Sequence, residues 1–307
     1  MNEIGYMAGE EYNRAFEEDI KEGLKLPVEK SFYVPVWPRY KNQEVFSTTE
    51  TISSDKNSDI GALKALYNSR GNKRATYRDL YPQGETYEFG DSRTVNINTE
   101  ADSVQWFNST TARSSIMSVM AEFDNLIHGM VTGINKVLSS NGTAEGTADD
   151  HLMFARITID KLDDDTDGWS TANLMINPDV QQTPSIMANG FRLDDGSRDQ
   201  QRADALVNLF SSRFSSLNPN NGTQLTFAGY YSAIVSENAT NGKVYNSIAA
   251  NQEAMVRSVE SQRQEVVGVS DSDELTQMIR YQNAYNASSR YINTINSMLD
   301  TLINSMT

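Results

Sequence analysis

The strongest hydrophobic pattern in the chain lies at its C-terminal end, over residues 269–307. This stretch contains neither proline nor glycine, and its apolar residues recur in alternating steps of three and four. Such spacing is typical of a long helix that packs against other helices. The predicted packing interface consists of Leu275, Met278, Ile279, Tyr285, Ile292, Ile295, Leu299, Leu302, Ile303 and Met306.

The beginning of this C-terminal helix is also marked in the sequence. Gly268 ends the preceding helical pattern, and Ser270 with Asp273 fits a capping box. Burying about eight large apolar side chains stabilises by roughly 12–24 kcal/mol. Ordering about thirty-five residues costs on the order of 35–70 kcal/mol of backbone entropy. We therefore expect this helix to become firm only when it docks on a partner, although burial inside a helical bundle of the same chain is the alternative.

A second long helix is predicted over about residues 104–138. Gly129 and Gly133 lie four residues apart in it, which allows another helix to approach closely. The pattern leaves open whether this helix packs inside its own chain or against another. Its apolar row is formed by Ile116, Val119, Phe123, Leu126, Met130, Gly133 and Val137, with Met120, Ile127, Ile134 and Leu138 beside it.

The N-terminal part shows shorter elements. We predict a helix over residues 9–26 that is stopped by Pro27, followed by an extended segment over 32–40. Two prolines in that segment predict an edge strand or a polyproline-like conformation. Residues 45–52 are its predicted strand partner. A short helix capped by Ser58 follows and ends at Gly71, and its predicted inward-facing residues are Ile60, Leu63, Leu66 and Tyr67.

Residues 139–150 are rich in Ser, Asn, Gly and Thr and mark a boundary. Apolar alternation then predicts short strands near residues 154–159 and 174–176. From Phe227 the helical pattern returns and continues to Val266, with Asn241-Gly242 as a predicted break.

These patterns predict an α+β fold that is predominantly α, with long coiled-coil-like helices and a small β-rich insert. We expect four regions. They are a poorly defined N-terminal segment over 1–58, a helical region over 59–138, the β-rich insert over 139–226 and the C-terminal helices over 227–307.

The C-terminal segment also resembles a known family. It is similar to the C-terminal segment of bacterial flagellar axial proteins (the rod, hook and junction proteins), and most similar to the hook-associated protein 1 family. Asp271-Ser272 departs from that family, which usually has an apolar residue just before the acidic pair. The resemblance is carried by Gly268-Val269, Asp273-Glu274-Leu275, Arg280-Tyr281-Gln282, Ala284-Tyr285, Ala287, Arg290, Ile292, Thr294 and Met298 to Asn304, and further upstream by Ile60 to Leu66, Asn177-Pro178, Pro184, Ile186 and Ala188.

This resemblance implies a structural subunit of the flagellum at the hook–filament junction, which acts by helix packing and self-assembly. It implies other copies of the chain, neighbouring hook and junction proteins, and an export chaperone at the C-terminal helix as partners. It also implies an extracellular place in the flagellum after export without a cleaved signal peptide. A rod or hook protein with the same C-terminal segment is the alternative within this class. Residues 1–27 do not resemble the N-terminal segment of the family, so we expect an N-terminally truncated chain.

Composition narrows the function further. The formal net charge of −15 disfavours nucleic acid and anionic membranes as partners. The chain has no cysteine, which excludes disulfides, thiol chemistry and cysteine-based metal sites. No apolar run reaches the length of a membrane span, and the first thirty residues lack the apolar region of a secretory signal.

Candidate chemistry is sparse. Asp163, Asp165, Asp167 and Gly168 copy the opening of a calcium loop, but Leu174 stands where a bidentate Glu is needed. A secreted binding module with a calcium-binding acidic loop is therefore an alternative of another class. The two histidines, His128 and His151, do not stand at metal-ligand spacing. Tyr281, Tyr285 and Tyr291 fit helix packing better than a stacking platform for bases. We expect no enzyme, no cofactor and no metal.

Overall fold

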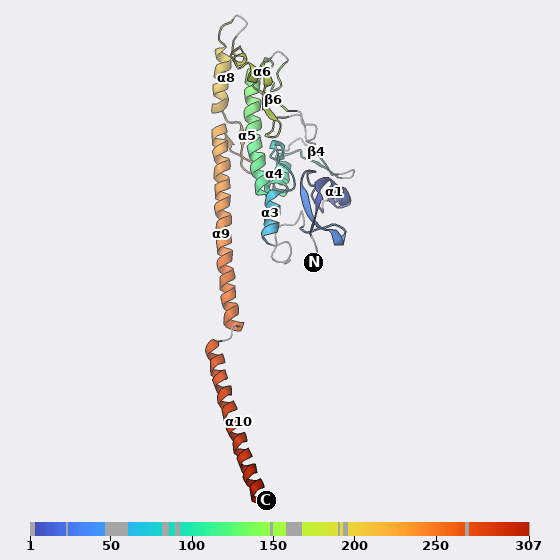
Figure 1. Cartoon of the computed structure of the whole chain (residues 1–307). Helices are drawn as coiled ribbons and strands as arrows, with labels where there is room; N and C mark the ends of the chain where they lie inside the picture. Colours follow the sequence, from blue (N-terminus) through green and yellow to red (C-terminus); the bar gives the residue numbers. More distant parts are fainter. Residues whose placement is uncertain are drawn as a thin grey trace. The chain divides into compact units, whose positions relative to one another are not determined.

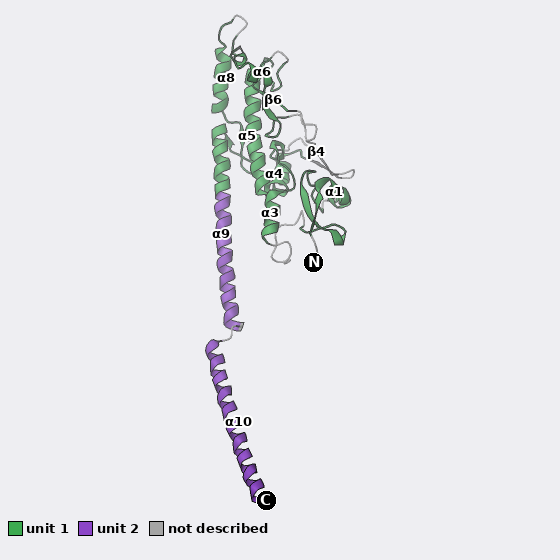
Figure 2. Cartoon of the chain, viewed as in Figure 1, with its two compact units in different colours: residues 1–239 green, residues 240–307 purple. Residues whose placement is uncertain are grey.

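A computed structural model describes residues 4–22, 24–46, 61–81, 86–89, 93–147, 150–157, 168–189, 191–192, 196–267 and 270–306 (Figure 1). The chain divides into two compact units, residues 1–239 and residues 240–307 (Figure 2). Long helices dominate and the strands are short and antiparallel, which confirms the predicted α-rich α+β class. The four predicted regions, with boundaries at 58, 138 and 226, stay a prediction. Within the described ranges, no helix is long and apolar enough to cross a lipid bilayer.

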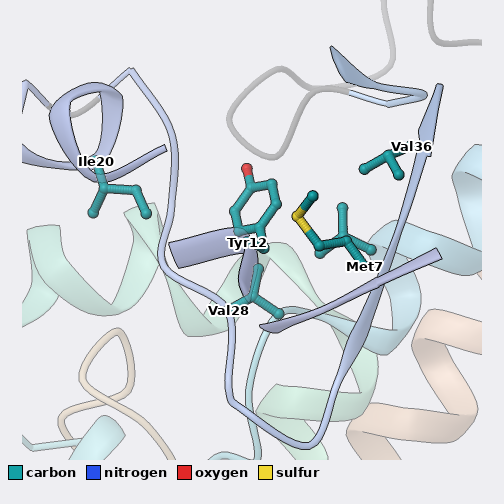
Figure 3. Close-up of a cluster of buried hydrophobic side chains, with 6 residues drawn as sticks. Met7, Tyr12, Ile20, Val28 and Val36 are labelled. Atoms are coloured by element: carbon teal, nitrogen blue, oxygen red, sulfur yellow. The ribbon is translucent and has the colours of Figure 1, made fainter. Parts of the chain in front are cut away.

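The N-terminal part of the first unit is a small sheet covered by two short helices. Strands β1 (Gly5–Ala8), β2 (Tyr33–Trp37) and β3 (Gln43–Glu44) pair antiparallel in the order β1-β2-β3. Helices α1 (Gly9–Ala15) and α2 (Glu17–Lys21) follow β1. Alternate strand residues face these helices and form a core with side chains from the helices and the following loop, shown in Figure 3: Met7, Tyr12, Ile20, Val28, Val34 and Val36.

Two N-terminal predictions were wrong. The single helix over 9–26 is interrupted at Phe16, which has φ −118° and ψ 29°. The Phe16 ring packs 5.0 Å from the Tyr12 ring, so the chain turns at Phe16 to keep both aromatic rings at the core.

The predicted edge strand is instead the central strand β2, with Pro35 inside it. This is tolerated because Pro35 lies at the end of the β2–β3 pairing, where its carbonyl accepts from the Val45 N–H at 3.0 Å and a missing N–H costs little. The 3₁₀ turn η1 (Pro38–Tyr40) separates β2 from β3.

The next helix, α3 (Ala62–Arg70), ends at Gly71 as predicted. Gly71 has φ 78°, and a Cβ there would lie 2.1 Å from Met117 Sδ. The inward orientation predicted for Leu63 and Leu66 was wrong, because these side chains are 59% and 67% exposed. Lys64 is buried instead, with its ammonium over the rings of Phe46 and Tyr67. The predicted cap Ser58, and most of the strand predicted over 45–52, lie outside the described residues.

The second long helix is two helices. Helix α4 (Glu100–Ser109) begins with a capping box at Thr99, the 3₁₀ turn η3 (Thr111–Arg113) follows, and α5 covers Ser115–Leu138. The predicted start near residue 104 is therefore wrong. A new helix begins because the Ser114 hydroxyl accepts from the Met117 N–H at 3.1 Å and donates to the Ser69 carbonyl at 2.6 Å.

Helix α5 is the centre of the first unit. Leu126, Ile134 and Leu138 are buried in its own chain, whereas Ile116 and Phe123 of the predicted apolar row are 48% and 42% exposed. The predicted close approach of another helix is confirmed at Gly133, whereas the nearest neighbour of Gly129 is Phe214, which lies outside the helices. A Cβ on Gly129 would lie 2.7 Å from the Phe214 ring, and one on Gly133 would lie 2.6 Å from Leu209 Cδ1. The close neighbour is α8 (Gln200–Ser211), which lies beside α5 in Figure 1.

Polar side chains of α5 are buried as well, and they bind the backbone of surrounding loops. Asp124 accepts from the Tyr77 N–H at 2.9 Å and the Thr171 N–H at 2.6 Å. Asn135 donates to the Phe154 carbonyl at 3.0 Å and accepts from the Phe154 N–H at 3.2 Å. These contacts attach the turn η2 (Tyr77–Asp79) and the segments around Phe154 and Thr171 to α5.

The insert has the two predicted strands, which pair as β6 (Phe154–Arg156) and β7 (Leu174–Ile176). Helix α6 (Pro178–Gln182), capped by Asn177, and α7 (Ile186–Asn189) follow. Two further hairpins pair β4 (Thr86–Phe89) with β5 (Arg93–Asn96), and β8 (Ser215–Ser216) with β9 (Gln224–Leu225).

Helix α9 (Phe227–Val267) begins in the first unit, where Phe227, Tyr230 and Ile234 pack around Leu126 of α5. It continues through Asn241-Gly242, so the predicted break there was wrong. A glycine inside a helix costs about 1 kcal/mol relative to alanine. The surrounding helical hydrogen bonds outweigh that cost.

A buried carboxylate lies where α9 meets α5. Glu122 is 2% exposed, and its Oε1 accepts from Asn218 Nδ2 at 3.3 Å and Ser118 Oγ at 3.5 Å. Burial and the nearby Glu237 carboxylate raise the pKa of Glu122 to about 7. Burial also raises the pKa of Glu237. The hydrogen-bond partners of Glu122 in the described part of the chain, Asn218 and Ser118, are both neutral, so the charged form of Glu122 is costly.

Glu122→Gln is expected to stabilise the protein in a pH-dependent way. The pKa of Glu122 is raised on folding from 4.5 to about 7, so its contribution is most favourable below pH 4.5 and is lost as the pH rises through 7. A shift of this size corresponds to roughly 3 kcal/mol above pH 7. Urea unfolding at pH 4.5 and pH 8 should show the gain only at pH 8. An equal gain at both pH values would contradict this assignment.

Asp124→Ala is expected to destabilise the first unit by about 3 kcal/mol, because two buried N–H groups lose their acceptor. The urea midpoint of the first unit, followed by circular dichroism, measures this effect. Asp204→Ala, at a carboxylate on the exposed face of α8, is the matched control and should change stability by less than about 0.5 kcal/mol. Equal effects of the two substitutions would show that Asp124 does not hold the loops.

Candidate assembly interface

Helix α10 (Asp271–Met306) lies in the second unit and carries the predicted packing interface. The Asp273 N–H lies 3.4 Å from Ser270 Oγ, and the Asp273 and Glu274 N–H groups donate to the Ser270 carbonyl. Ser270 therefore occupies the predicted position at the helix start. Asp271, Asp273 and Glu274 lie in the first turn, where the helix dipole favours negative charge.

Every residue from Ser270 to Ser305 is exposed. Nine of the ten predicted interface side chains are large apolar groups with exposed fractions between 37% for Ile295 and 75% for Tyr285, and the tenth, Met306, ends the helix. By contrast, the apolar face of α5 includes the buried side chains of Leu126, Val131 and Leu138. The two helices have similar apolar spacing, but only α5 has its apolar face covered by the same chain.

The exposed apolar surface is wider than the predicted interface. Tyr281, Tyr291 and Met298 are 71%, 68% and 67% exposed on α10. The part of α9 in the second unit also exposes large apolar side chains at helical spacings of three, seven and four residues: Tyr245, Ile248, Met255 and Val259. Sequence reasoning recognised these positions as helical without assigning them to the interface. The spacing of these apolar residues is visible in the sequence, but it does not distinguish an exposed apolar face from a buried one.

The candidate metal and catalytic residues do not form a site in the described part of the chain. His128 Nδ1 lies 2.9 Å from the Trp169 carbonyl, and its ring stacks 3.7 Å from the Tyr77 ring. Burial lowers the pKa of His128, so its neutral form is favoured. Asp163, Asp165 and Asp167 lie outside the described residues. Elsewhere in the described ranges, no three metal-ligating side chains come together.

Comparison with known proteins finds similarity to flagellar proteins at the C-terminal end of the chain. Residues 260–306 match the family described as "Flagellar basal body rod FlgEFG protein C-terminal". Flagellar hook-associated protein 1 of Bacillus subtilis (strain 168) is 29% identical over 116 residues, which are 38% of this chain and 22% of that protein. The resemblance to flagellar hook-associated protein 1 is confirmed. The protein of that name from Salmonella typhimurium (strain LT2) is 28% identical over 112 residues, or 36% of this chain and 19% of the relative.

The alignments therefore span about a fifth of the length of these curated relatives. The matched segment 260–306 includes all of α10 and the last turns of α9. None of the matched names denotes an enzyme. No solved structure matches the chain significantly.

Leu299→Asp is expected to leave the stability of the isolated chain nearly unchanged, within about 0.5 kcal/mol, because this side chain is already 49% exposed. Leu126→Asp, at a buried position of α5, should unfold the first unit, since it places an unpaired charge in the core. Thermal unfolding of the two variants measures the contrast. A large loss of stability in the Leu299 variant would show that α10 is packed within the chain.

Proposed function

We propose that this chain is a structural subunit of the bacterial flagellum at the hook–filament junction, and that it acts by helix packing and self-assembly. The observation that carries the proposal is helix α10, in which every residue from Asp271 to Ser305 is exposed. It lies within the segment that matches the flagellar family. The names of the curated relatives support the junction as its place.

The energetics of α10 support a role in assembly. Helical stability in proteins comes mostly from packing of an apolar face, and α10 has no such packing along its described length. Full burial of a large apolar side chain stabilises by roughly 1.5–3 kcal/mol. The proposed interface offers ten such groups: Leu275, Met278, Ile279, Tyr285, Ile292, Ile295, Leu299, Leu302, Ile303 and Met306. Docking of this surface therefore provides the driving force for assembly.

The proposed partners are other copies of the chain and neighbouring hook and junction proteins. An export chaperone that covers α10 before assembly is a further proposed partner, because a long exposed apolar helix is prone to premature association. The proposed location is extracellular, in the flagellum, after export without a cleaved signal peptide. A rod or hook protein is the alternative, since the family matched by residues 260–306 includes rod proteins by its description.

The proposal is tested by binding of the full chain to flagellar hooks purified from the source bacterium. The chain should sediment with the hooks, and a variant carrying Leu275→Asp and Leu299→Asp should bind at least about tenfold more weakly, because each substitution places a charge in the docked interface. Asn283→Asp and Ser297→Asp together are the matched control on other positions of α10. Equal binding of all three proteins would contradict the role of the α10 surface.

Amide hydrogen exchange gives an independent measurement on the isolated chain. Residues 271–306 should exchange rapidly, whereas the amides of α5 should be protected, because only α5 is covered by its own chain. Binding to hooks should then slow exchange in α10. Strong protection of α10 in the isolated monomer would mean that its apolar face is already buried within the chain, and the proposed function would lose its physical basis.

A further inference from the structure

The beginning of helix α9 is attached to α5 by an apolar and a polar contact. Tyr230 and Ile234 pack with Leu126 of α5, which is the apolar part. In the polar part, the Tyr230 hydroxyl accepts from Asn125 Nδ2 at 3.1 Å and donates to the Leu217 carbonyl at 3.0 Å. Tyr230 is fully buried, so these hydrogen bonds are shielded from water and fix α9 at this residue.

Two carboxyl groups lie beside this attachment, one on each helix. Glu122 of α5 is buried, and its Oε1 accepts only from the neutral donors Asn218 Nδ2 at 3.3 Å and Ser118 Oγ at 3.5 Å. Glu237 follows Tyr230 by two turns of α9 and is half-buried, and its charge acts on Glu122. A buried carboxylate that faces a second carboxylate and neutral donors is unstable in its charged form.

We infer that Glu122 and Glu237 form a proton-controlled latch, in which a protonated Glu122 holds the turns of α9 after Tyr230 on α5 and an ionised Glu122 releases them. The ligand of this latch is therefore a proton, and the part that moves is a short stretch of one helix. Both carboxyl groups belong to the first unit, so the latch does not depend on the proposed function.

The groups that bind or perturb Glu122 in the described part of the chain are acidic or neutral. Glu237 and Tyr230 face it from α9, Tyr81 from the segment after η2, and Asn218 from the segment after β8. Burial raises the pKa of both tyrosines, and the charge of Glu122 contributes to both shifts. Their hydroxyls therefore stay protonated when Glu122 ionises, and the carboxyl groups alone respond near neutral pH.

The two protonation states of Glu122 have opposite effects on α9. A protonated carboxyl group has no charge and one O–H donor, which a carboxylate on the facing helix can accept. Its other oxygen still accepts from Asn218. After ionisation this donor is lost, the charges of Glu122 and Glu237 repel each other, and the buried charge gains free energy when water reaches it.

The hydrogen bonds determine where the latch opens. Ionisation strengthens the bond from Asn218 to Glu122, because a charged acceptor binds an N–H group more tightly than a neutral one. The segment that carries Asn218 therefore stays in place, and repulsion acts on Glu237 of α9. The Tyr230 hydroxyl holds the preceding turn. Opening therefore begins after Tyr230 and exposes Ile234, which is buried in the closed form.

The pH range follows from the shift at Glu122. Burial and the Glu237 charge raise its pKa from 4.5 to about 7 in the closed form. In the open form, water restores the ordinary pKa. The ratio of open to closed molecules should therefore rise about tenfold per pH unit between pH 4.5 and 7 and level off above pH 7. The complete change is about 300-fold, with the latch most firmly closed below pH 4.5.

Spin labels test this opening in the full-length chain. The chain has no cysteine, so Lys136→Cys on α5 with Val235→Cys on α9 gives two unique labelling sites at exposed positions. Paramagnetic resonance should show one narrow distance distribution at pH 5 and an added population at longer distance at pH 8. Lys136→Cys with Asp204→Cys, which joins α5 to α8, is the control pair and should give the same distribution at both pH values.

Substitutions of the carboxyl groups identify the source of the change. Glu122→Gln should remove the longer-distance population at pH 8, and Glu237→Gln should reduce it because the repulsion is lost. Glu253→Gln, at an exposed carboxylate of the same helix, should behave as the unsubstituted chain. The latch would be refuted by an unchanged distribution from pH 5 to pH 8, by an equal pH response in the Glu122 variant, or by equal broadening in the control pair, which would show that the whole unit loosens.

Discussion

The first unit depends on the need of buried backbone groups for hydrogen-bond partners. The loops around α5 have few backbone partners of their own in regular structure, and buried N–H and C=O groups are costly when unpaired. Asp124 and Asn135 of α5 supply these partners directly. Asn125 acts on the backbone only through the hydroxyl of another side chain. The amide of Asn125 donates to the Tyr230 hydroxyl at 3.1 Å, and that hydroxyl donates to the Leu217 carbonyl at 3.0 Å. Helix α5 therefore acts as both the hydrophobic core and the polar frame of this unit.

Periodicity predicted the long helices but not their interruptions. The apolar spacing of α5, α9 and α10 is a local property, so it is visible in the sequence. The break between α4 and α5 depends on Ser114, whose hydroxyl donates to a carbonyl 45 residues away. The turn at Phe16 and the central position of Pro35 likewise depend on contacts with distant segments. Such interruptions are decided by tertiary structure, and a local pattern does not contain them.

The helical positions of the ten candidate interface residues could be read from the sequence, because apolar spacing is a local property of one helix. That these residues form an interface stays a prediction. The same reasoning could not tell that α5 would be covered and α10 exposed, since both have a row of large apolar residues. Nor could it find the raised pKa of Glu122, which depends on Glu237 and on burial beside Asn218, 96 residues away. Residue spacing identifies which face of a helix is apolar. Whether other side chains bury that face depends on the rest of the chain.

The sheets of the first unit are small: in the described ranges none has more than three strands, and the longest strand has five residues. Strand edges with unpaired backbone groups are sites at which crowded proteins join edge to edge. Strand β3 is only two residues long, and its pairing with β2 stops next to Pro35 of that strand. It therefore offers almost no template for a further strand. Edge-to-edge association of copies through these small sheets is thereby disfavoured in the described part of the chain, and the exposed apolar surface lies on helices instead.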